Sequence, residues 1–209
     1  MGHLFLDIET YISKGDENSA LNPYKDASKV LVISFSYYDG FKPPAKAQIR
    51  EPVFLKEWES SEKEILAAFY NFLKKTRQSD QWLKICGFNI LKFDIPYLFG
   101  RMKTHKIAGE EELYDLLFRP FGTDLMQLSA IISEKTAKHG QLWGTNHKGT
   151  SAFFKLQVKE GTGADVSTFY DKKEFGKIMK YCREEFNLEQ MLDAFYLHVT
   201  EKNQSKKLI

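Results

Sequence analysis

Residues 28–38, SKVLVISFSYY, are almost continuously apolar and rich in β-branched and aromatic side chains. A run of this kind predicts a β-strand that is covered on both faces, as in sheets with a layer of helices on each side. It is also the longest apolar run in the chain, and it is far shorter than the ~20 residues that cross a bilayer. The sequence therefore favours an α/β fold and predicts no membrane segment.

Three further segments have the character of strands. Residues 3–9, HLFLDIE, and residues 83–89, LKICGFN, are apolar, whereas residues 47–55, AQIREPVFL, contain Pro52, which favours an interrupted edge strand. Helices are predicted from apolar spacing and capping residues at 60–75, 94–105, 110–118, 123–135 and 171–200, the last as one helix or as two with a bend. Residues 139–150 are glycine-rich and are predicted to form a loop.

The order of these elements predicts how the sheet is connected. The first three strands follow one another directly, which favours an antiparallel meander, and a strand that returns after a helix favours a parallel addition. We therefore expect a mixed central sheet flanked by helices, in a single domain over residues 1–200. Residues 201–209 are expected to be a polar C-terminal tail.

The composition narrows the class of protein without identifying a partner. Hydrophobic residues make up 43% of the 209 residues, which suffices for a packed core, and a net charge of +2 gives little evidence for a nucleic-acid partner. Two cysteines, Cys86 and Cys182, cannot form a disulfide framework or a multi-cysteine zinc site. Because the N-terminal stretch lacks the basic start of a signal peptide, the expected location is the cytoplasm.

The strand over residues 3–9 ends in two carboxylates. Asp7 and Glu9 are two positions apart, so in a strand they project from one face while Leu6 and Ile8 point to the other. Two like charges at this separation raise each other's pKa unless a cation lies between them, and Mg²⁺ is a hard cation that binds carboxylate oxygens. The alternative is that the strand simply ends here and both acids face solvent.

Two later stretches carry further candidates. GFNILKFDIPYL places Asn89 and Asp94 between a buried strand and a helix, where Asp94 could bind a metal or could cap the helix. In MKYCREEFNLEQML, Tyr181 and Glu185 are four positions apart and share one helical face. The alternative for this third stretch is an ordinary amphipathic helix with a solvated glutamate.

Taken in order, DIET, GFNILKFDIPYL and YCREE resemble the motifs of the DEDD 3′–5′ exonucleases, and more closely those of stand-alone proteins related to the proofreading domain of family B DNA polymerases. The N-x-x-x-F-D form from Asn89 to Asp94 carries most of the closer match, and the resemblance spans residues 3–196. The family's last motif is Tyr-x-x-x-Asp, whereas this chain has Glu185 at the final position, which moves the carboxylate outward by one methylene.

The resemblance implies an RNase H-like fold and an enzyme that hydrolyses phosphodiester bonds with two divalent metal ions, Mg²⁺ or Mn²⁺. The implied metal ligands are Asp7, Glu9, Asp94 and Glu185, with Asp7 shared between the ions, and Tyr181 is expected to orient the attacking water. The residues expected to contact the substrate are Thr10, Tyr11, Asn89 and Phe93. The alternatives are that Tyr11 and Phe93 are core residues and that Asn89 only stabilises its turn.

The implied substrate is the 3′ end of single-stranded DNA, with replication or repair proteins as possible partners. Basic residues near Tyr181 could help to bind phosphates or could form a solvated face; they are Lys172, Lys173, Lys177, Lys180 and Arg183. His139 and His147 have no acid or cysteine at ligand spacing and are expected to be ordinary loop residues. Two other classes remain open: an exoribonuclease of the same superfamily, and a domain of this fold that binds nucleic acid without cutting it.

Overall fold

The computed structural model describes residues 1–11, 22–25, 27–133 and 144–205, with side chains as far as residue 201. Among these residues, five strands form one sheet in the order β3-β2-β1-β4-β5. The strands are β1 Gly2–Tyr11, β2 Lys29–Asp39, β3 Val53–Lys56, β4 Lys84–Gly87 and β5 Phe121–Asp124. The first three pair in antiparallel fashion, whereas β4 lies parallel to β1 and β5 parallel to β4. The predicted meander and the predicted parallel addition are both confirmed.

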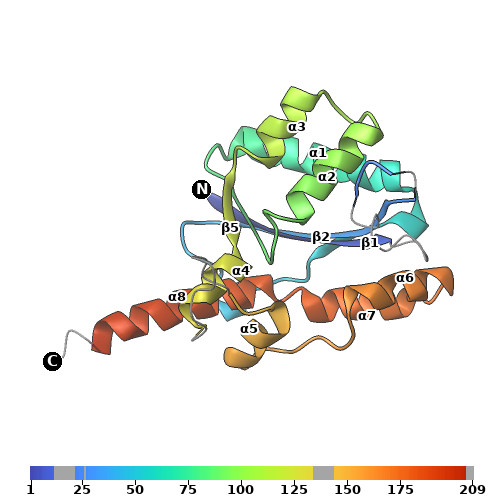
Figure 1. Cartoon of the computed structure of the whole chain (residues 1–209). Coiled ribbons are helices and arrows are strands. Elements are labelled where there is room, and N and C mark those ends of the chain that lie inside the picture. The colour runs from blue at the N-terminus through green and yellow to red at the C-terminus, as the bar shows by residue number, and fades with distance from the viewer. Residues whose placement is uncertain (12–21, 26, 134–143, 206–209) are drawn as a thin grey trace, which may run out of the picture.

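Helices cover both faces of the sheet (Figure 1). One layer consists of α1 Glu62–Ser79, α2 Asp94–Thr104 and α3 Glu110–Leu117. The other contains α4 Leu125–Leu128, α5 His147–Phe153, α6 Gly163–Asp171, α7 Phe175–Glu185 and α8 Leu188–Ser205. Short 3₁₀ turns lie at η1 Lys46–Gln48, η2 Glu57–Glu59 and η3 Ser129–Ile131. This arrangement confirms the predicted α/β fold with a mixed sheet between helical layers.

The strand β1 divides its side chains between the two layers. Leu4 and Leu6 pack into the core that the sheet shares with α1, α2 and α3. Phe5 packs into a second core with residues of α8. Because side chains alternate along a strand, Asp7 and Glu9 follow Phe5 on the face toward the second layer.

The strand β2 lies inside the sheet, and every residue from Val30 to Ser36 is buried. This confirms that the apolar run is a strand covered on both faces. No helix in the described ranges is both long enough and apolar enough to cross a membrane.

The structure corrects the predicted extent of two segments. Residues 47–52 do not belong to the predicted edge strand, because β3 begins only at Val53, directly after Pro52. The helix predicted over 123–135 begins later, because residues 123 and 124 belong to the strand β5. The helical part consists of α4 and η3, and residues 134 and 135 lie outside the described ranges. The short β5 has no alternating pattern of its own, so its formation depends on pairing with β4.

The predicted helix over 171–200 is two helices, α7 and α8. The break lies at Phe186, whose backbone leaves the helical region at φ −78° and ψ 66°. The Asn187 amide then donates to Ser151 Oγ (3.2 Å) and to the Gln157 carbonyl oxygen (2.9 Å). α8 runs on into the predicted tail, and α5 begins inside the predicted loop, whereas α6 was not predicted.

Candidate active site

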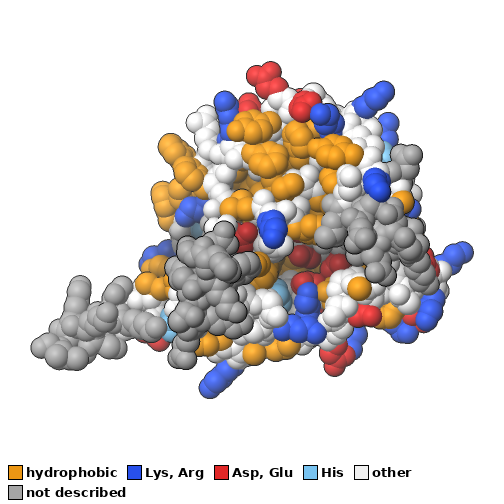
Figure 2. All heavy atoms as spheres, in the orientation of Figure 1, with side chains coloured by type: hydrophobic (Ala, Val, Ile, Leu, Met, Phe, Trp, Pro, Cys, Tyr) orange, Lys and Arg blue, Asp and Glu red, His pale blue; other side chains and the backbone are white. Residues whose placement is uncertain are grey.

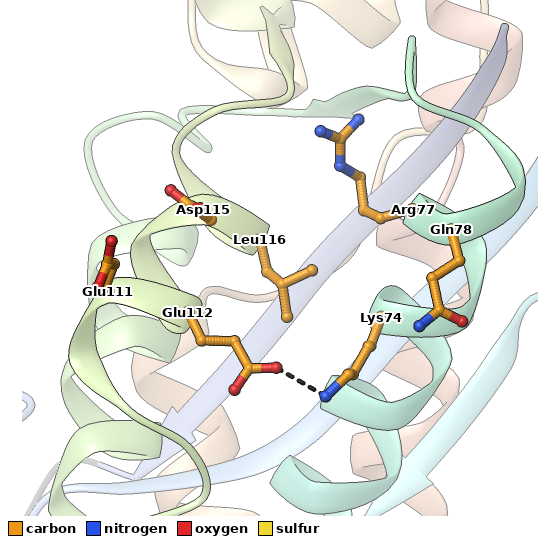
Figure 3. A pocket seen from close by; sticks show the side chains of 7 residues that line it. All are labelled: Lys74, Arg77, Gln78, Glu111, Glu112, Asp115 and Leu116. Atoms are coloured by element: carbon orange, nitrogen blue, oxygen red, sulfur yellow. Dashed lines mark hydrogen bonds and ion pairs between the residues drawn. The ribbon is translucent and has the colours of Figure 1, made fainter.

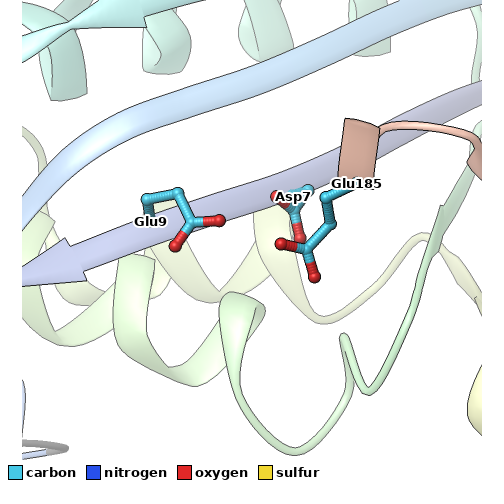
Figure 4. Close-up of side chains that lie close together, drawn as sticks. All are labelled: Asp7, Glu9 and Glu185. Atoms are coloured by element: carbon cyan, nitrogen blue, oxygen red, sulfur yellow. The ribbon is translucent and has the colours of Figure 1, made fainter. Parts of the chain in front are cut away.

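Three carboxylates from distant parts of the chain meet at one point (Figure 4). Asp7 and Glu9 come from β1, and Glu185 is the last residue of α7. One oxygen from each lies within 4.8 Å of the others. Figure 2 shows acidic side chains in a hollow near the middle of one face of the molecule, below a largely apolar surface.

The cluster lies in a pocket of about 400 Å³ between the sheet and the second helical layer. Eight of the nine residues predicted for the site line this pocket: Asp7, Glu9, Thr10, Asn89, Phe93, Asp94, Tyr181 and Glu185. The tertiary structure therefore brings all three sequence motifs to one cavity. The pocket is also lined by residues that the sequence did not point to, among them His147 and Lys159.

Tyr11 is the predicted residue that does not line the pocket. Its hydroxyl donates to Asp171 Oδ1 at 2.7 Å, and its ring meets the Tyr170 ring edge-on at a centroid distance of 5.6 Å. These contacts join the end of β1 to α6. Its predicted contact with substrate stays a prediction.

Asp94 contacts β1 instead of capping its own helix. The residue preceding α2 is Phe93, which makes no side-chain capping bond, while Asp94 Oδ1 accepts the backbone N–H of Ile8 at 3.0 Å. Burial raises the pKa of Asp94 to about 7, helped by the charges of Glu185 and Asp124 and opposed by the Ile8 hydrogen bond. Of the two sequence interpretations, the pocket location fits a ligand, and Asp94 is the first residue of α2 instead of its N-cap.

The surroundings of the other three carboxylates shift their pKa values in opposite directions. Burial, and then the charge of Glu185, raises the pKa of both Asp7 and Glu9 well above the ordinary value. Burial would also raise the pKa of Glu185, but the adjacent Lys159 ammonium outweighs it and holds that pKa below the ordinary value. Without a cation, Asp7 and Glu9 therefore resist ionisation, while Glu185 stays charged.

A hard divalent cation fits this group of residues. The donors are carboxylate oxygens, which such ions prefer. Asp7 Oδ2 is buried and has no hydrogen-bond partner among the described residues, so its position costs free energy that a cation would recover. Asp7, Glu9 and Glu185 could bind one ion directly, with Asp94 in the same pocket.

Lys159 links the two ends of the third motif. Its Nζ donates to the Tyr181 hydroxyl at 2.8 Å and to Glu185 Oε1. Burial first, and then the Glu185 charge, raises the pKa of Tyr181, so this residue is a neutral phenol at ordinary pH. Lys159 lies in the segment between α5 and α6, 22 residues before Tyr181, and no local pattern marks it.

His147 has a different place from the one expected. It is buried at the start of α5, and its Nε2 lies 3.1 Å from the carbonyl oxygen of Glu185. Because a carbonyl only accepts, Nε2 is the protonated nitrogen, and burial lowers the pKa of the ring so that it is neutral. The expectation of an ordinary loop residue is wrong, and His139 lies outside the described residues.

The loop of the middle motif is fixed by Asp124, another residue that the sequence did not indicate. Asn89 has a positive φ of 60°, a conformation that asparagine tolerates better than most residues. Asp124 Oδ1 accepts the N–H of Asn89 (2.9 Å), and Oδ2 accepts that of Leu91 (3.3 Å). The end of β5 therefore holds the loop that places Asn89 and Phe93 in the pocket wall.

The basic residues near Tyr181 are mostly paired with acids. Lys177 pairs with Glu174, Lys180 with Glu160 and Glu184, and Arg183 with Glu51. The Glu184 carboxylate also accepts the backbone N–H of Glu160, so it lies apart from the carboxylate cluster. These contacts favour the interpretation of a solvated, ion-paired face.

A second pocket, between α1 and α3, has a different character (Figure 3). It is lined by charged side chains of both signs, and Lys74 Nζ bonds Glu112 Oε1 across it at 2.7 Å. Lys74 and Glu112 are each more than two-fifths exposed to solvent. This surface lacks the buried, convergent carboxylates of the first pocket.

Comparison with known proteins agrees with this geometry. The sequence profile of the exonuclease domain of DNA polymerase family B matches residues 3–116, more than half of the chain. The match includes Asp7, Glu9 and Asp94 and stops before Tyr181 and Glu185. A search of curated proteins finds no match.

The fold is similar to that of the family B DNA polymerase from the hyperthermophilic archaeon Pyrobaculum calidifontis, with a TM-score of 0.58 and 16% sequence identity. The similarity covers 97% of this chain and only 24% of the polymerase chain, and it extends past the profile match to the third motif. This chain therefore belongs to the exonuclease domain family of the family B DNA polymerases, within the DEDD exonucleases of RNase H-like fold.

Proposed function

We propose that this protein is a metal-dependent 3′–5′ exonuclease that removes nucleotides from the 3′ end of single-stranded DNA. The observation that carries the proposal is the convergence of Asp7, Glu9 and Glu185 within 4.8 Å, in a pocket that also contains Asp94 and Tyr181. Family membership supports the nuclease chemistry. The two-metal mechanism and the preference for single-stranded DNA are part of the proposal.

The reaction is the hydrolysis of the last phosphodiester bond. The oxygen of a water molecule bonds to the phosphorus of the terminal nucleotide, and the bond from phosphorus to the preceding 3′-oxygen breaks. That oxygen takes up a proton and becomes the new 3′-hydroxyl, while the terminal nucleotide leaves as a 5′-monophosphate. Divalent cations bound by the four carboxylates would make the water more acidic and stabilise the charge on the leaving oxygen.

The protein's own groups then hold and orient the reactants. Tyr181 is a neutral phenol, so it can direct the attacking water by a hydrogen bond but cannot remove its proton. Lys159 brings a positive charge to an otherwise acidic pocket, beside Tyr181 and Glu185. Phe93 and Asn89 in the pocket wall are suited to contact the terminal bases, and an aromatic ring can stack on any base.

The first test is the substitution Asp7→Ala. Asp7 is shared by both ions in the proposed mechanism, so its loss should lower the rate of single-turnover cleavage by on the order of 10³-fold or more. The assay follows a labelled single-stranded oligonucleotide in Mg²⁺ and in Mn²⁺, with EDTA as the blank. Full activity in correctly folded Asp7→Ala protein would disprove the metal assignment.

The same assay separates the alternatives. Parallel DNA and RNA oligonucleotides of one sequence identify an exoribonuclease by faster loss of the RNA. Binding of either oligonucleotide without cleavage in any metal would identify a domain that only binds nucleic acid.

A further inference from the structure

Four large apolar side chains lie on the first helical layer and on the loop that leads into it, and we call them the apolar ridge. They are Leu91 in the loop before α2, Phe99 in α2, Tyr114 in α3 and Phe118 directly after α3. Tyr114 is 52% exposed, Leu91 42% and Phe118 41%. Figure 2 shows an apolar surface that reaches down this face to the acidic hollow. Exposed apolar surface of this kind usually marks a binding site.

The rings of the ridge are ordered by one another. Phe118 stacks with Tyr114 at a centroid distance of 5.6 Å and an interplanar angle of 18°. It also meets Phe99 edge-on, with centroids 5.4 Å apart and planes at 76°. Phe118 is therefore packed against both Phe99 and Tyr114, and the two exposed rings keep two-fifths or more of their surface in contact with solvent.

The ridge joins the pocket through the loop of the middle motif. Leu91 lies over β5, where a Cβ on Gly122 would come within 2.6 Å of Leu91 Cδ2. The Leu91 N–H bonds Asp124, the residue that also fixes Asn89 in the pocket wall. Lys92 follows as an exposed cation, and no ion pair of its side chain occurs among the described residues.

We propose that this ridge binds the single strand upstream of the reacting 3′ end by stacking its bases on Tyr114 and Phe118. The inference rests on the proposed function, because only a polymeric substrate has a portion that must lie outside the pocket. Aromatic rings give sequence-independent stacking, and the exposed Lys92, which has no ion pair among the described residues, suits a phosphate backbone. The continuity with Asn89 and Phe93 favours nucleic acid over a protein partner.

The test measures binding without requiring cleavage. Full-length protein in Ca²⁺, under conditions in which no cleavage is detected, is titrated with a fluorescent oligothymidylate of about 12 nucleotides, a length that one single-strand-binding fold can cover. Tyr114→Ala and Phe118→Leu should each weaken binding about tenfold, the loss of one base stack. Phe118→Leu keeps an apolar side chain against Phe99, so it removes the ring face while preserving the packing.

Two controls make the result specific to stacking. Phe41→Ala removes a ring that is 76% exposed in the connection between β2 and β3, and it should leave binding unchanged. An abasic oligonucleotide of the same length keeps the phosphates but has no bases, so wild type, Tyr114→Ala and Phe118→Leu should bind it equally. Equal affinity of these three proteins for the base-bearing oligothymidylate would overturn the proposal and leave the ridge as a protein-docking surface.

Substrate length separates this inference from the proposed function. If the ridge binds the upstream strand, Tyr114→Ala and Phe118→Leu should raise the KM for the 12-nucleotide strand more than the KM for a trinucleotide. If wild type cleaves neither, the proposed function fails, and the binding titration still decides the role of the ridge.

Discussion

At the scale of single residues, Asp94 makes a structural contact and also lies in the candidate site. Its Oδ1 accepts the Ile8 N–H and thereby joins α2 to the central strand, while its side chain lines the acidic pocket. Its charge is unfavourable in the metal-free protein, because burial and neighbouring acids raise its pKa to about 7. The structural role needs an oxygen, whereas metal binding needs the charge.

We therefore predict that Asp94→Asn folds and is nearly inactive. The amide oxygen can still accept the Ile8 N–H, and removal of a buried charge should raise the melting temperature in EDTA at about pH 8. Thermal melts and single-turnover cleavage measure the two effects separately. A parallel loss of stability and activity would show that Asp94 acts only in the fold.

Glu185 is the residue at which the chain departs from its family, and here the longer arm reaches both Lys159 and the space beside Asp7. We predict that Glu185→Ala abolishes cleavage. We also predict that Glu185→Asp is impaired although aspartate is the family's residue, because the shorter arm leaves the carboxylate short of the ion. The loss should be larger in Mg²⁺ than in Mn²⁺, because Mg²⁺ demands near-ideal octahedral geometry.

Tyr181→Phe is the matched control for this motif. The variant keeps the ring in the apolar cluster between α7 and the sheet and removes only the hydroxyl. The cleavage rate should fall about 10–100-fold because the water is oriented less well, while metal binding persists. A higher rate in Glu185→Asp would show instead that Glu185 is a compromised ligand. An unchanged rate in Glu185→Ala would place the fourth ligand elsewhere.

At the scale of secondary-structure elements, one buried carboxylate joins three of them. Glu62, in the first turn of α1, accepts the Val30 N–H of β2 at 2.8 Å and both Nε (2.7 Å) and a terminal nitrogen (2.6 Å) of Arg101 in α2. Burial would raise the pKa of Glu62, but the Arg101 bonds and the Val30 N–H outweigh it and hold that pKa below its ordinary value. The contact fixes α2, whose first residue is Asp94, relative to the sheet.

We predict that Glu62→Gln lowers the free energy of unfolding by about 3 kcal/mol, because it removes the carboxylate charge that faces the buried Arg101 guanidinium. Urea titration at neutral pH measures this loss. Glu112→Gln, in the exposed pair with Lys74, is the control and should leave stability nearly unchanged. Equal losses of stability in the two variants would mean that the buried ion pair contributes no more to stability than the exposed one.

At the scale of the whole molecule, the candidate site brings acidic groups from distant parts of the fold into one buried pocket. Asp7, Glu9 and Asp94 all have a raised pKa, so the folded metal-free protein holds protons that the unfolded chain releases. The stability that Asp94 contributes should therefore fall as the pH rises from about 4 to about 7, and the contributions of Asp7 and Glu9 should fall in the same direction. Below that range, Glu62 and Glu185, whose pKa is lowered, act in the opposite direction.

This predicts a melting temperature in EDTA that is higher at about pH 5.5 than at about pH 8. Addition of Mn²⁺ at about pH 8 should reverse the loss, by about 2.7 kcal/mol at a concentration 100 times the Kd. Asp7→Asn should show a smaller difference between the two pH values and a smaller response to Mn²⁺. A wild-type melting temperature that is the same at both pH values, with and without Mn²⁺, would contradict this account.

The carboxylates and the tyrosine of the candidate site could be predicted from the sequence, because each of their patterns is local. Alternation along a strand puts Asp7 and Glu9 on one face, and helical spacing puts Tyr181 and Glu185 on another. The buried β2 follows from its apolar run alone. These patterns follow from the periodicity of the strand and of the helix, so they do not depend on contacts with the rest of the chain.

Only the tertiary structure decided the contacts of segments that have no strand or helix periodicity in their sequence. Lys159, His147 and Asp124 come from a connecting segment, from the start of a short helix and from the end of a four-residue strand, and each acquires its role from partners far away in the chain. The break between α7 and α8 likewise depends on the contacts of Asn187 with Ser151 and Gln157. Sequence alone determined which carboxylates this protein offers, because local geometry suffices for that; the charge and the hydrogen bonds that each one meets depend on packing between elements.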